Sequence, residues 1–326
     1  MSPNAPYSEL SPETVLDALE ALNYRSDGRV LALNSYENRV YQIGIEDAEP
    51  LIAKFYRPNR WSDTAILEEH AFSLELAAQE IPVVAPLKTA ERTLHVHQGF
   101  RYAVFPRRGG RWPELGKRDD REWVGRFLGR IHAVGRTAVF QQRATLSVQT
   151  LGWDARDTVL DGEWMPDYLA DKYADVTERL LQEIELKAAH WNGARLSRIL
   201  GDCHRGNILW TDGGPHFVDL DDCISGPAIQ DIWMLLSGGP QDMRTELTDL
   251  LAGYQQFCSF DSREIALIEP LRALRMIHYS AWLARRWDDP AFPQAFPWFA
   301  EARYWEQHYR ALEEQFTAVV EPPLEL

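Results

Sequence analysis

The first hundred residues alternate apolar and polar positions in a pattern that predicts a helix followed by a small mixed sheet. Ser11 as N-cap and Pro12 at the first helical position start an amphipathic helix that runs to Leu22. Helical spacing returns at residues 65–78, whereas shorter segments show the two-residue period of strands. The predicted strands are residues 29–33, 38–45, 50–56, 87–88, 93–97 and 100–105.

Beyond residue 105 the pattern becomes largely helical. The sequence Pro-Arg-Arg-Gly-Gly at 106–110 interrupts the regular pattern and predicts a boundary. The predicted helices after it are residues 119–132, 164–191, 228–236, 241–259, 263–287 and 301–319. We therefore expect an α+β, two-lobed, protein-kinase-like fold. Residues 1–105 form a small β-rich lobe that binds nucleotide, and residues 106–326 form a larger, mostly helical catalytic and substrate lobe.

One predicted hairpin in the helical part gathers residues that phosphoryl transfer requires. Its strands are residues 207–211 and 216–220, and Asp202 lies in the loop just before them. Asn207 follows Asp202 by 207 − 202 = 5 residues and Asp219 follows it by 219 − 202 = 17. This is the order of the catalytic loop and the metal-binding carboxylate in protein kinases.

These three residues have distinct predicted roles. We expect Asp202 to orient the acceptor hydroxyl, and Asn207 and Asp219 to bind Mg²⁺ on the phosphates of ATP. A single Asp before a strand is more often a turn residue or a cap. Three such residues at this spacing favour the catalytic interpretation.

Lys54 lies inside an otherwise apolar predicted strand. A buried lysine is costly unless an anion pairs with it, so we expect Lys54 to contact the nucleotide phosphates and a helix glutamate. The alternative is a lysine that extends from the sheet edge to solvent. Glu68 and Glu69 both follow in the next helix; Glu69 shares a face with Phe72 and Leu76 and is the preferred partner, but the choice stays open.

The rest of the expected nucleotide site lies in a loop and at the boundary. Residues 34–39 join the first two strands, where a kinase carries its phosphate-covering loop, and Ser35 is the candidate contact. This loop has no glycine, so an ordinary polar turn is an equal alternative. Val104 and Phe105, at the end of the last strand, are expected to line the adenine pocket.

Two polar residues of the helical part have structural interpretations. Asp231 opens a predicted helix soon after Asp219, and it either binds backbone N–H groups of the catalytic loop or simply complements the helix dipole. His132, at the end of another predicted helix, is expected in the core.

The aromatic residues near the end of the chain predict packing rather than a ligand cage. Residues 277–287 carry Tyr, Trp and His at helical spacing, and Phe and Trp residues follow them. If this stripe lines the cleft, Arg285 and Arg286 are placed to meet an acidic or phosphorylated substrate.

Composition narrows the class of protein. The 326 residues carry a formal net charge of −15, which argues against a nucleic-acid partner. No apolar run approaches the roughly 18 residues of a membrane span, and the N-terminus does not resemble a signal peptide. The 3 cysteines have no framework spacing, which indicates a reducing compartment. We expect a cytoplasmic monomer that acts on protein substrates and has no nucleic-acid or membrane partner.

Six motifs resemble the stress response kinase A (YihE/RdoA) family, within the wider aminoglycoside/choline kinase-like group. This resemblance implies a bacterial cytoplasmic Ser/Thr protein kinase that uses ATP and Mg²⁺ and acts in stress responses. It also implies that Asp202 is the catalytic residue, that Asn207 and Asp219 bind metal, and that Ser35 lies at the phosphate loop. The motifs are residues 34–42, 54–58, 201–210, 217–222, 226–236 and 267–275.

The chain departs from the wider group at one position. That group usually has His-Gly-Asp-x-His at the catalytic loop, and Leu200 stands here in place of the first His, which usually braces the loop. The leading hypothesis remains an ATP- and Mg²⁺-dependent Ser/Thr protein kinase. The alternatives are a small-molecule kinase of the same fold and a non-enzymatic binding protein, which the intact set of catalytic residues disfavours.

Overall fold

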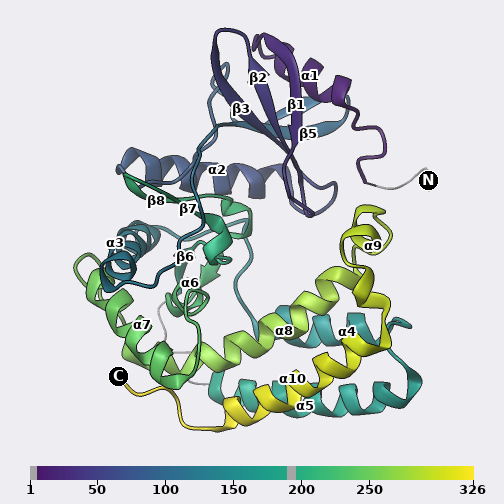
Figure 1. Cartoon of the computed structure of the whole chain (residues 1–326), viewed down its shortest axis with the longest axis vertical. Coiled ribbons are helices and arrows are strands. Elements are labelled where there is room, and N and C mark those ends of the chain that lie inside the picture. Colours follow the sequence, from purple (N-terminus) through teal and green to yellow (C-terminus); the bar gives the residue numbers. More distant parts are fainter. Residues whose placement is uncertain (1–5, 189–195) are drawn as a thin grey trace.

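The N-terminal part of the chain is a five-stranded antiparallel sheet in the computed structural model, which describes residues 6–188 and 196–326. Its elements are α1 (Pro12–Glu20), β1 (Ser26–Ala32), β2 (Arg39–Ile45), β3 (Ala48–Phe55), α2 (Asp63–Ala78), β4 (His95–His97) and β5 (Phe100–Pro106). The strand order is β1-β2-β3-β5-β4, and the sheet lies at the top of the molecule in Figure 1. The predicted N-cap is confirmed, since Ser11 Oγ accepts the Thr14 N–H at 3.2 Å.

The two faces of this sheet pack against different helices. Val15 of α1 packs with Val104 on one face, whereas Ile66 of α2 packs with Ala103 on the other. Lys54 pairs across the strands with Ala103, so its side chain points to the α2 face. The lysine therefore faces the helical part of the molecule.

The rest of the chain is mostly helical, which confirms the predicted α+β class and two-lobed arrangement (Figure 1). The helices are α3 (Arg118–Gly135), α4 (Asp154–Leu160), α5 (Asp167–Ala188), α6 (Ile229–Trp233), α7 (Pro240–Tyr254), α8 (Ile268–Ala284), α9 (Ala291–Ala295) and α10 (Ala302–Val320). Shorter helical segments are the π-helix Gln149–Trp153 and the 3₁₀ segments Arg205–Asn207, Leu220–Asp222, Ser262–Leu267 and Pro297–Ala300. Two small antiparallel pairs are β6 (Ser197–Ile199) with β9 (Ile224–Gly226), and β7 (Ile208–Thr211) with β8 (Gly214–Phe217).

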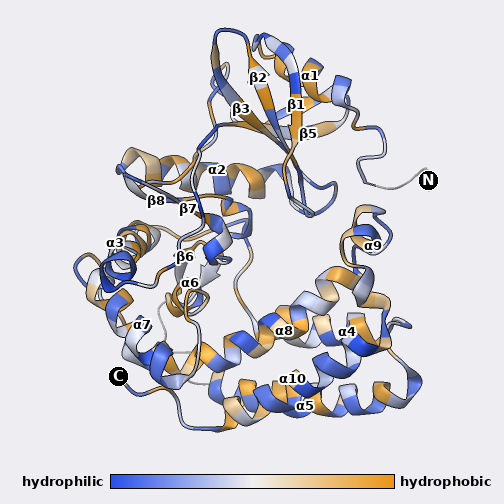
Figure 2. Cartoon of the chain, viewed as in Figure 1, coloured by the Kyte–Doolittle hydropathy of each residue, from blue (hydrophilic) through white to orange (hydrophobic). Residues whose placement is uncertain are grey.

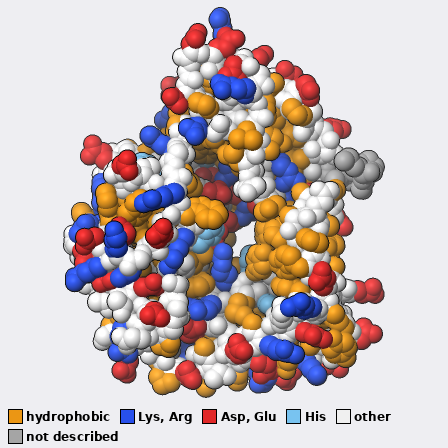
Figure 3. Space-filling model, viewed as in Figure 1, with side chains coloured by type: hydrophobic (Ala, Val, Ile, Leu, Met, Phe, Trp, Pro, Cys, Tyr) orange, Lys and Arg blue, Asp and Glu red, His pale blue; other side chains and the backbone are white. Residues whose placement is uncertain are grey.

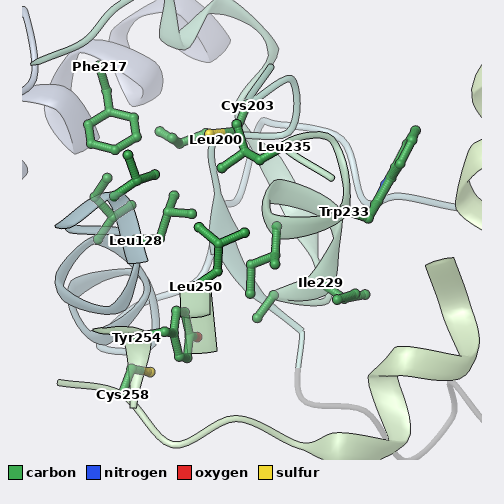
Figure 4. Packing of buried hydrophobic residues seen from close by; sticks show 14 of the residues in the cluster. Leu128, Leu200, Cys203, Phe217, Ile229, Trp233, Leu235, Leu250, Tyr254 and Cys258 are labelled. Atoms are coloured by element: carbon green, nitrogen blue, oxygen red, sulfur yellow. The ribbon is translucent and has the colours of Figure 1, made fainter. Parts of the chain in front are cut away.

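Two hydrophobic clusters support the helical part. One lies under the β7–β8 hairpin, where Leu200 and Phe217 pack together with Leu128 of α3 and Leu250 of α7 (Figure 4). The other joins α4, α5, α8 and α10. Figure 2 shows hydrophobic and hydrophilic residues alternating along α5, α8 and α10, as expected of helices with one buried face. Within the described ranges, no helix has both the length and the apolar composition of a membrane span.

Several predicted elements differ from the structure at their ends. Residues 87–88 are not a strand, and the helix predicted at 164–191 begins at Asp167. The predicted end of that helix, beyond Ala188, lies outside the described residues. The segment predicted as one helix from 263 begins as a 3₁₀ turn and becomes α8 only at Ile268.

The catalytic hairpin is tighter than predicted. Thr211 pairs with Gly214, so the turn contains only Asp212 and Gly213, and β8 ends at Phe217. Asp219 was predicted inside the second strand but lies beyond it. The β6–β9 pair was not predicted, because strands of three residues are too short to show a period.

Helices α3 and α7 approach so closely that glycines are required where they cross. A Cβ on Gly253 would lie 2.0 Å from the Glu122 carbonyl oxygen, and one on Gly125 would lie 2.0 Å from that of Leu250. Backbone atoms at such contacts cannot move aside as a flexible side chain can. Glycine at these positions therefore sets the distance between the two helices that carry much of the core below the hairpin.

Gly253→Ala should force α7 away from α3. We expect a loss of about 1–3 kcal/mol or more in the free energy of unfolding, measured by urea denaturation. The exposed Gly116 is the matched control, since a Cβ there meets no atom within 4 Å. Equal stability of the Gly253→Ala and Gly116→Ala proteins would contradict this account of the crossing.

Candidate active site

The structure brings the three predicted catalytic-loop residues together. The Asn207 side-chain amide donates to the backbone carbonyl of Asp202 at 3.0 Å, which leaves the Asn207 side-chain oxygen available as a ligand. Asp219 follows β8 in a left-handed conformation, with φ 57°. Its carboxylate lies 2.7 Å from the Nζ of Lys54, which comes from the opposite lobe.

Lys54 is buried among carboxylates. Besides Asp219, its Nζ lies 3.4 Å from Asp221 Oδ1, and Glu69 adds to the attraction. Burial alone lowers the pKa of Lys54, but the three carboxylates outweigh it and raise this pKa above its usual range. The lysine therefore stays an ammonium group, as the predicted contact with nucleotide phosphates requires.

The open choice between Glu68 and Glu69 has a structural answer. The Glu68 carboxylate accepts backbone N–H groups of Gln141 and Arg143, at 2.6 and 2.9 Å, and so holds the chain after α3. Glu69 is only 1% exposed and interacts electrostatically with Lys54. Burial raises the pKa of Glu69 to about 7, although Lys54 opposes this rise. The structure thus places Glu69, rather than Glu68, beside the lysine.

The raised pKa of Glu69 makes a prediction about pH. Because the folded-state pKa of about 7 lies above the usual glutamate pKa of about 4.5, this group's contribution to stability is lost as pH rises from about 4.5 to about 7. Glu69→Gln cannot ionise, so we expect its stability relative to wild type to be greater at about pH 8 than at about pH 5. Urea denaturation at both pH values measures this difference, with Glu20→Gln as the exposed control. A difference that is the same at both pH values would contradict the assignment.

Asp221 is a further acidic residue at the centre of the site, and our sequence analysis gave it no role. It is 2% exposed, accepts a hydrogen bond from Asn38 Nδ2 at 3.0 Å and forms ion pairs with Arg60 and Lys54. Burial opposes its ionisation, but Lys54 and Arg60 outweigh burial and lower the pKa of Asp221 below its usual range. The signal was present in the sequence as a second carboxylate two residues after Asp219.

The loop at residues 34–39 lies between the lobes and is held to α8. Ser35 Oγ donates to the Asn38 carbonyl at 3.1 Å, so this hydroxyl helps to shape the loop. Glu37 accepts from Trp282 Nε1 at 2.6 Å and pairs with Arg286 Nε at 2.5 Å, both on or just after α8. The loop therefore closes the side of the cleft opposite the chain connection between the lobes.

Asp289 strengthens this closure from the helical part. Its carboxylate pairs with Arg39 at 3.0 Å and with Arg57 at 2.8 Å, both from the N-terminal sheet region. Tyr36 packs against Phe296 with ring centroids 4.8 Å apart. Some of the late aromatic residues thus lie in the core, as predicted, and others pack against the loop at residues 34–39. Arg286, which was expected to meet a substrate if the stripe lined the cleft, is instead paired with Glu37.

The two predicted pocket residues on β5 differ in orientation. Phe105 pairs across the strands with Ile52 and packs on the α2 face, the face of Lys54. Val104 is buried on the α1 face, and its carbonyl already accepts the Leu87 N–H at 2.7 Å. Of the two side chains, the structure brings only that of Phe105 to the face that carries Lys54.

A buried carboxylate braces the catalytic loop. Asp231 accepts the backbone N–H groups of Leu200 and Gly201, each at 2.8 Å, and also contacts His132 Nε2 at 2.9 Å. This confirms the prediction that Asp231 binds backbone N–H groups of the catalytic loop. His132 is buried as predicted, but it acts through a hydrogen bond as well as through packing.

The brace explains how the loop tolerates Leu200. The leucine side chain packs in the hydrophobic cluster below the hairpin, while its backbone N–H is held by Asp231. Gln230 Nε2 also donates to the Gly201 carbonyl at 2.8 Å. The loop conformation therefore does not depend on a histidine side chain at position 200.

Asp231→Asn should loosen this loop. The new amide group cannot accept both backbone N–H groups and the histidine, so we expect a loss of about 2–5 kcal/mol in the free energy of unfolding. Hydrogen exchange at the Leu200 and Gly201 amides should quicken along with it. Asp212→Asn, at the exposed hairpin turn, is the control; protection of both amides unchanged in Asp231→Asn would refute the brace.

Both oxygens of the Asp202 carboxylate face cationic or N–H groups. Arg275 Nη1, from α8, lies 2.5 Å from Oδ1, and His204 Nε2 lies 3.5 Å from Oδ2. His204 Nδ1 accepts the Gly206 N–H at 2.9 Å, so Nε2 is the nitrogen that bears the proton in the neutral ring. No local pattern predicts this role of Arg275, because 275 − 202 = 73 residues separate it from its partner.

The site offers hard oxygen ligands for a divalent cation. The Asn207 amide oxygen and the half-exposed Asp219 carboxylate fit Mg²⁺, which keeps waters and substrate phosphates as its other ligands. Residues 6–188 and 196–326 contain no cluster of three or more His, Cys, Asp and Glu side chains suited to a metal. Figure 3 shows the surface hollowed between the lobes, with acidic and basic side chains at the bottom of the hollow.

Residues 29–268 match the model of the family described as "Phosphotransferase enzyme family". The chain belongs to this family. It is 46% identical to stress response kinase A of Escherichia coli strain K12 over 321 residues, covering 98% of this chain and 97% of that protein. It is also 45% identical over 320 residues to the serine/threonine protein kinase RdoA of Salmonella typhimurium, with the same coverage. The resemblance to the stress response kinase A family is thereby confirmed.

Solved structures show the same fold at low sequence identity. The amicoumacin kinase hAmiN, solved with AMP-PNP and Ca²⁺, has a TM-score of 0.75 at 20% identity. The match covers 96% of this chain and 94% of that one. A microcompartment-associated aminopropanol kinase has a TM-score of 0.70 at 18% identity, with 94% and 98% coverage. The family and the names of the relatives support a kinase, as the catalytic-loop spacing predicted.

Proposed function

We propose that this chain is an ATP- and Mg²⁺-dependent Ser/Thr protein kinase that acts in a bacterial stress response. The observation that carries the proposal is the convergence of Lys54 from the sheet with Asp202, Asn207 and Asp219 from the helical part. An ammonium group, two metal-binding oxygens and a carboxylate near an open hollow are the parts that phosphoryl transfer requires.

Each side chain has a role in the proposed reaction. Lys54 binds phosphate oxygens of ATP, and Asn207 and Asp219 hold the Mg²⁺, which neutralises charge on the phosphates when bound. Asp202 orients the acceptor hydroxyl and takes its proton as the oxygen attacks the γ-phosphorus. The bond from the γ-phosphorus to the bridging oxygen breaks, and ADP leaves.

The names of the nearer relatives favour a protein acceptor. The relatives at 45–46% identity are named as a stress response kinase and a serine/threonine protein kinase. The kinases named for small molecules are 20% identical or less, which shows the fold and leaves the acceptor open. The proposal includes a cytoplasmic monomer that acts on protein substrates and has no nucleic-acid or membrane partner; the net charge of −15 supports the absence of nucleic acid.

Asp202→Ala tests the proposal. In an assay with γ-labelled ATP, Mg²⁺ and a generic protein acceptor, we expect label on Ser or Thr from the wild type and a loss of about 10³-fold in Asp202→Ala. ATP affinity should be retained, since Lys54 and Asp219 are intact, and a chelator should abolish transfer. Asp212→Asn is the control for a surface carboxylate. Turnover by Asp202→Ala equal to wild type would refute the role of Asp202, and ATP use with metabolites alone would identify a small-molecule kinase.

A further inference from the structure

One face of α8 contacts both the catalytic loop and the loop at residues 34–39. Arg275 reaches Asp202 from this helix, and Trp282, with Arg286 just beyond the helix end, reaches Glu37 of the loop. Tyr279, four residues after Arg275, is exposed on the same face. This face therefore runs from the catalytic carboxylate to the loop at residues 34–39.

Arg275 differs from Arg60 and Arg286 in the carboxylate with which it pairs. Arg60 is paired with Asp221 and Asp222, and Arg286 is paired with Glu37. Among the residues that the structure describes, Arg275 has only the Asp202 carboxylate as an acidic partner, and its side chain is 43% exposed. Its guanidinium is therefore held by the one carboxylate that the proposed reaction needs.

The acceptor hydroxyl and Arg275 compete for the same group. To be oriented by Asp202, the hydroxyl must come within hydrogen-bond distance of a carboxylate whose Oδ1 is held by Arg275 and whose Oδ2 faces His204. A neutral acceptor that takes Oδ1 breaks the ion pair with Arg275 without replacing it. An acceptor with its own anion near the hydroxyl offers the guanidinium a new partner, and so releases Asp202 at little cost.

We propose that Arg275 is a specificity-determining residue that selects protein acceptors with a carboxylate side chain next to the Ser or Thr hydroxyl. This inference rests on the proposed protein kinase activity. The anion lies within roughly 5–8 Å of the hydroxyl oxygen, because both groups approach the Asp202–Arg275 pair at hydrogen-bond distance. An acidic residue directly beside the phosphorylated residue meets this requirement.

The net charge of the chain does not oppose such an acceptor at close range. At physiological ionic strength, charges separated by more than about 8 Å are largely screened. The overall charge of −15 therefore acts weakly on a bound peptide, whereas Arg275 contacts it directly.

The test uses three serine peptides that differ only in the residue after the serine, which is Asp, Asn or Lys. With γ-labelled ATP and Mg²⁺, we expect the wild-type kcat/KM to favour the Asp peptide over the Asn peptide by about tenfold or more. The Lys peptide should be the poorest. Arg275→Gln should bring the Asp-to-Asn ratio close to one, and Arg275→Glu should favour the Lys peptide.

Arg285→Gln is the matched control. Arg285 directly follows α8, but it donates to Thr158 and to the Asp154 carbonyl, away from Asp202. The Arg285→Gln protein should keep the wild-type ratio, and thermal unfolding should show that all three arginine variants are folded.

Three results would overturn the inference. Equal use of the Asp and Asn peptides by wild type would remove the selection while leaving the kinase activity in place. In Arg275→Gln, kcat/KM could fall by the same factor for all three peptides, together with the rate of slow ATP hydrolysis. That result would show that Arg275 acts on the transferred phosphoryl group instead of on the acceptor. Label on none of the peptides, with any variant, would refute the protein acceptor and this inference together.

Discussion

The cluster of charges around Lys54 is the constraint on which the rest of the site depends. The lysine comes from β3 of the sheet, whereas Asp219 and Asp221 follow the hairpin of the helical part. Removing an ammonium group from water costs several kcal/mol unless its partners are well placed, and loss of one partner leaves a buried charge unpaired. The lobes must therefore meet in one relative position, which is also the position that brings Lys54 to the metal-binding residues.

The second contact between the lobes has a different chemical character. The loop at residues 34–39 is held to α8 and α9 by Glu37, by Asp289 with its two arginines, and by the edge-to-face contact of Tyr36 with Phe296. With the chain connection on one side and this loop on the other, the cleft is closed at both edges. Arg275 of α8 reaches Asp202 of the catalytic loop, and both side chains stay partly exposed.

The catalytic loop shows how one function can be carried by different residues. The wider group that the sequence resembles usually has a histidine at position 200. Here the Leu200 side chain packs in the core, and the side chains of Asp231 and Gln230 hold the loop backbone. The Asp231 carboxylate holds two backbone N–H groups and also contacts His132. His132 is in turn hydrogen-bonded to Tyr254 at 3.0 Å. The buried charge is thus fully hydrogen-bonded, which is the condition for its stability.

The sequence by itself determined the features that depend on near neighbours along the chain. The spacing of Asp202, Asn207 and Asp219, the buried position of Lys54 and the cap at Ser11 follow from local periodicity and from the chemistry of single residues. Only the tertiary structure decided which of two adjacent glutamates faces Lys54, because the register of α2 on the sheet depends on the whole core. It also decided that Val104 turns to α1. The pairs Arg275 with Asp202, Glu37 with Arg286 and Arg57 with Asp289 join residues far apart in the chain, so no local pattern encodes them. They form only when packing of the two lobes has fixed where each side chain lies.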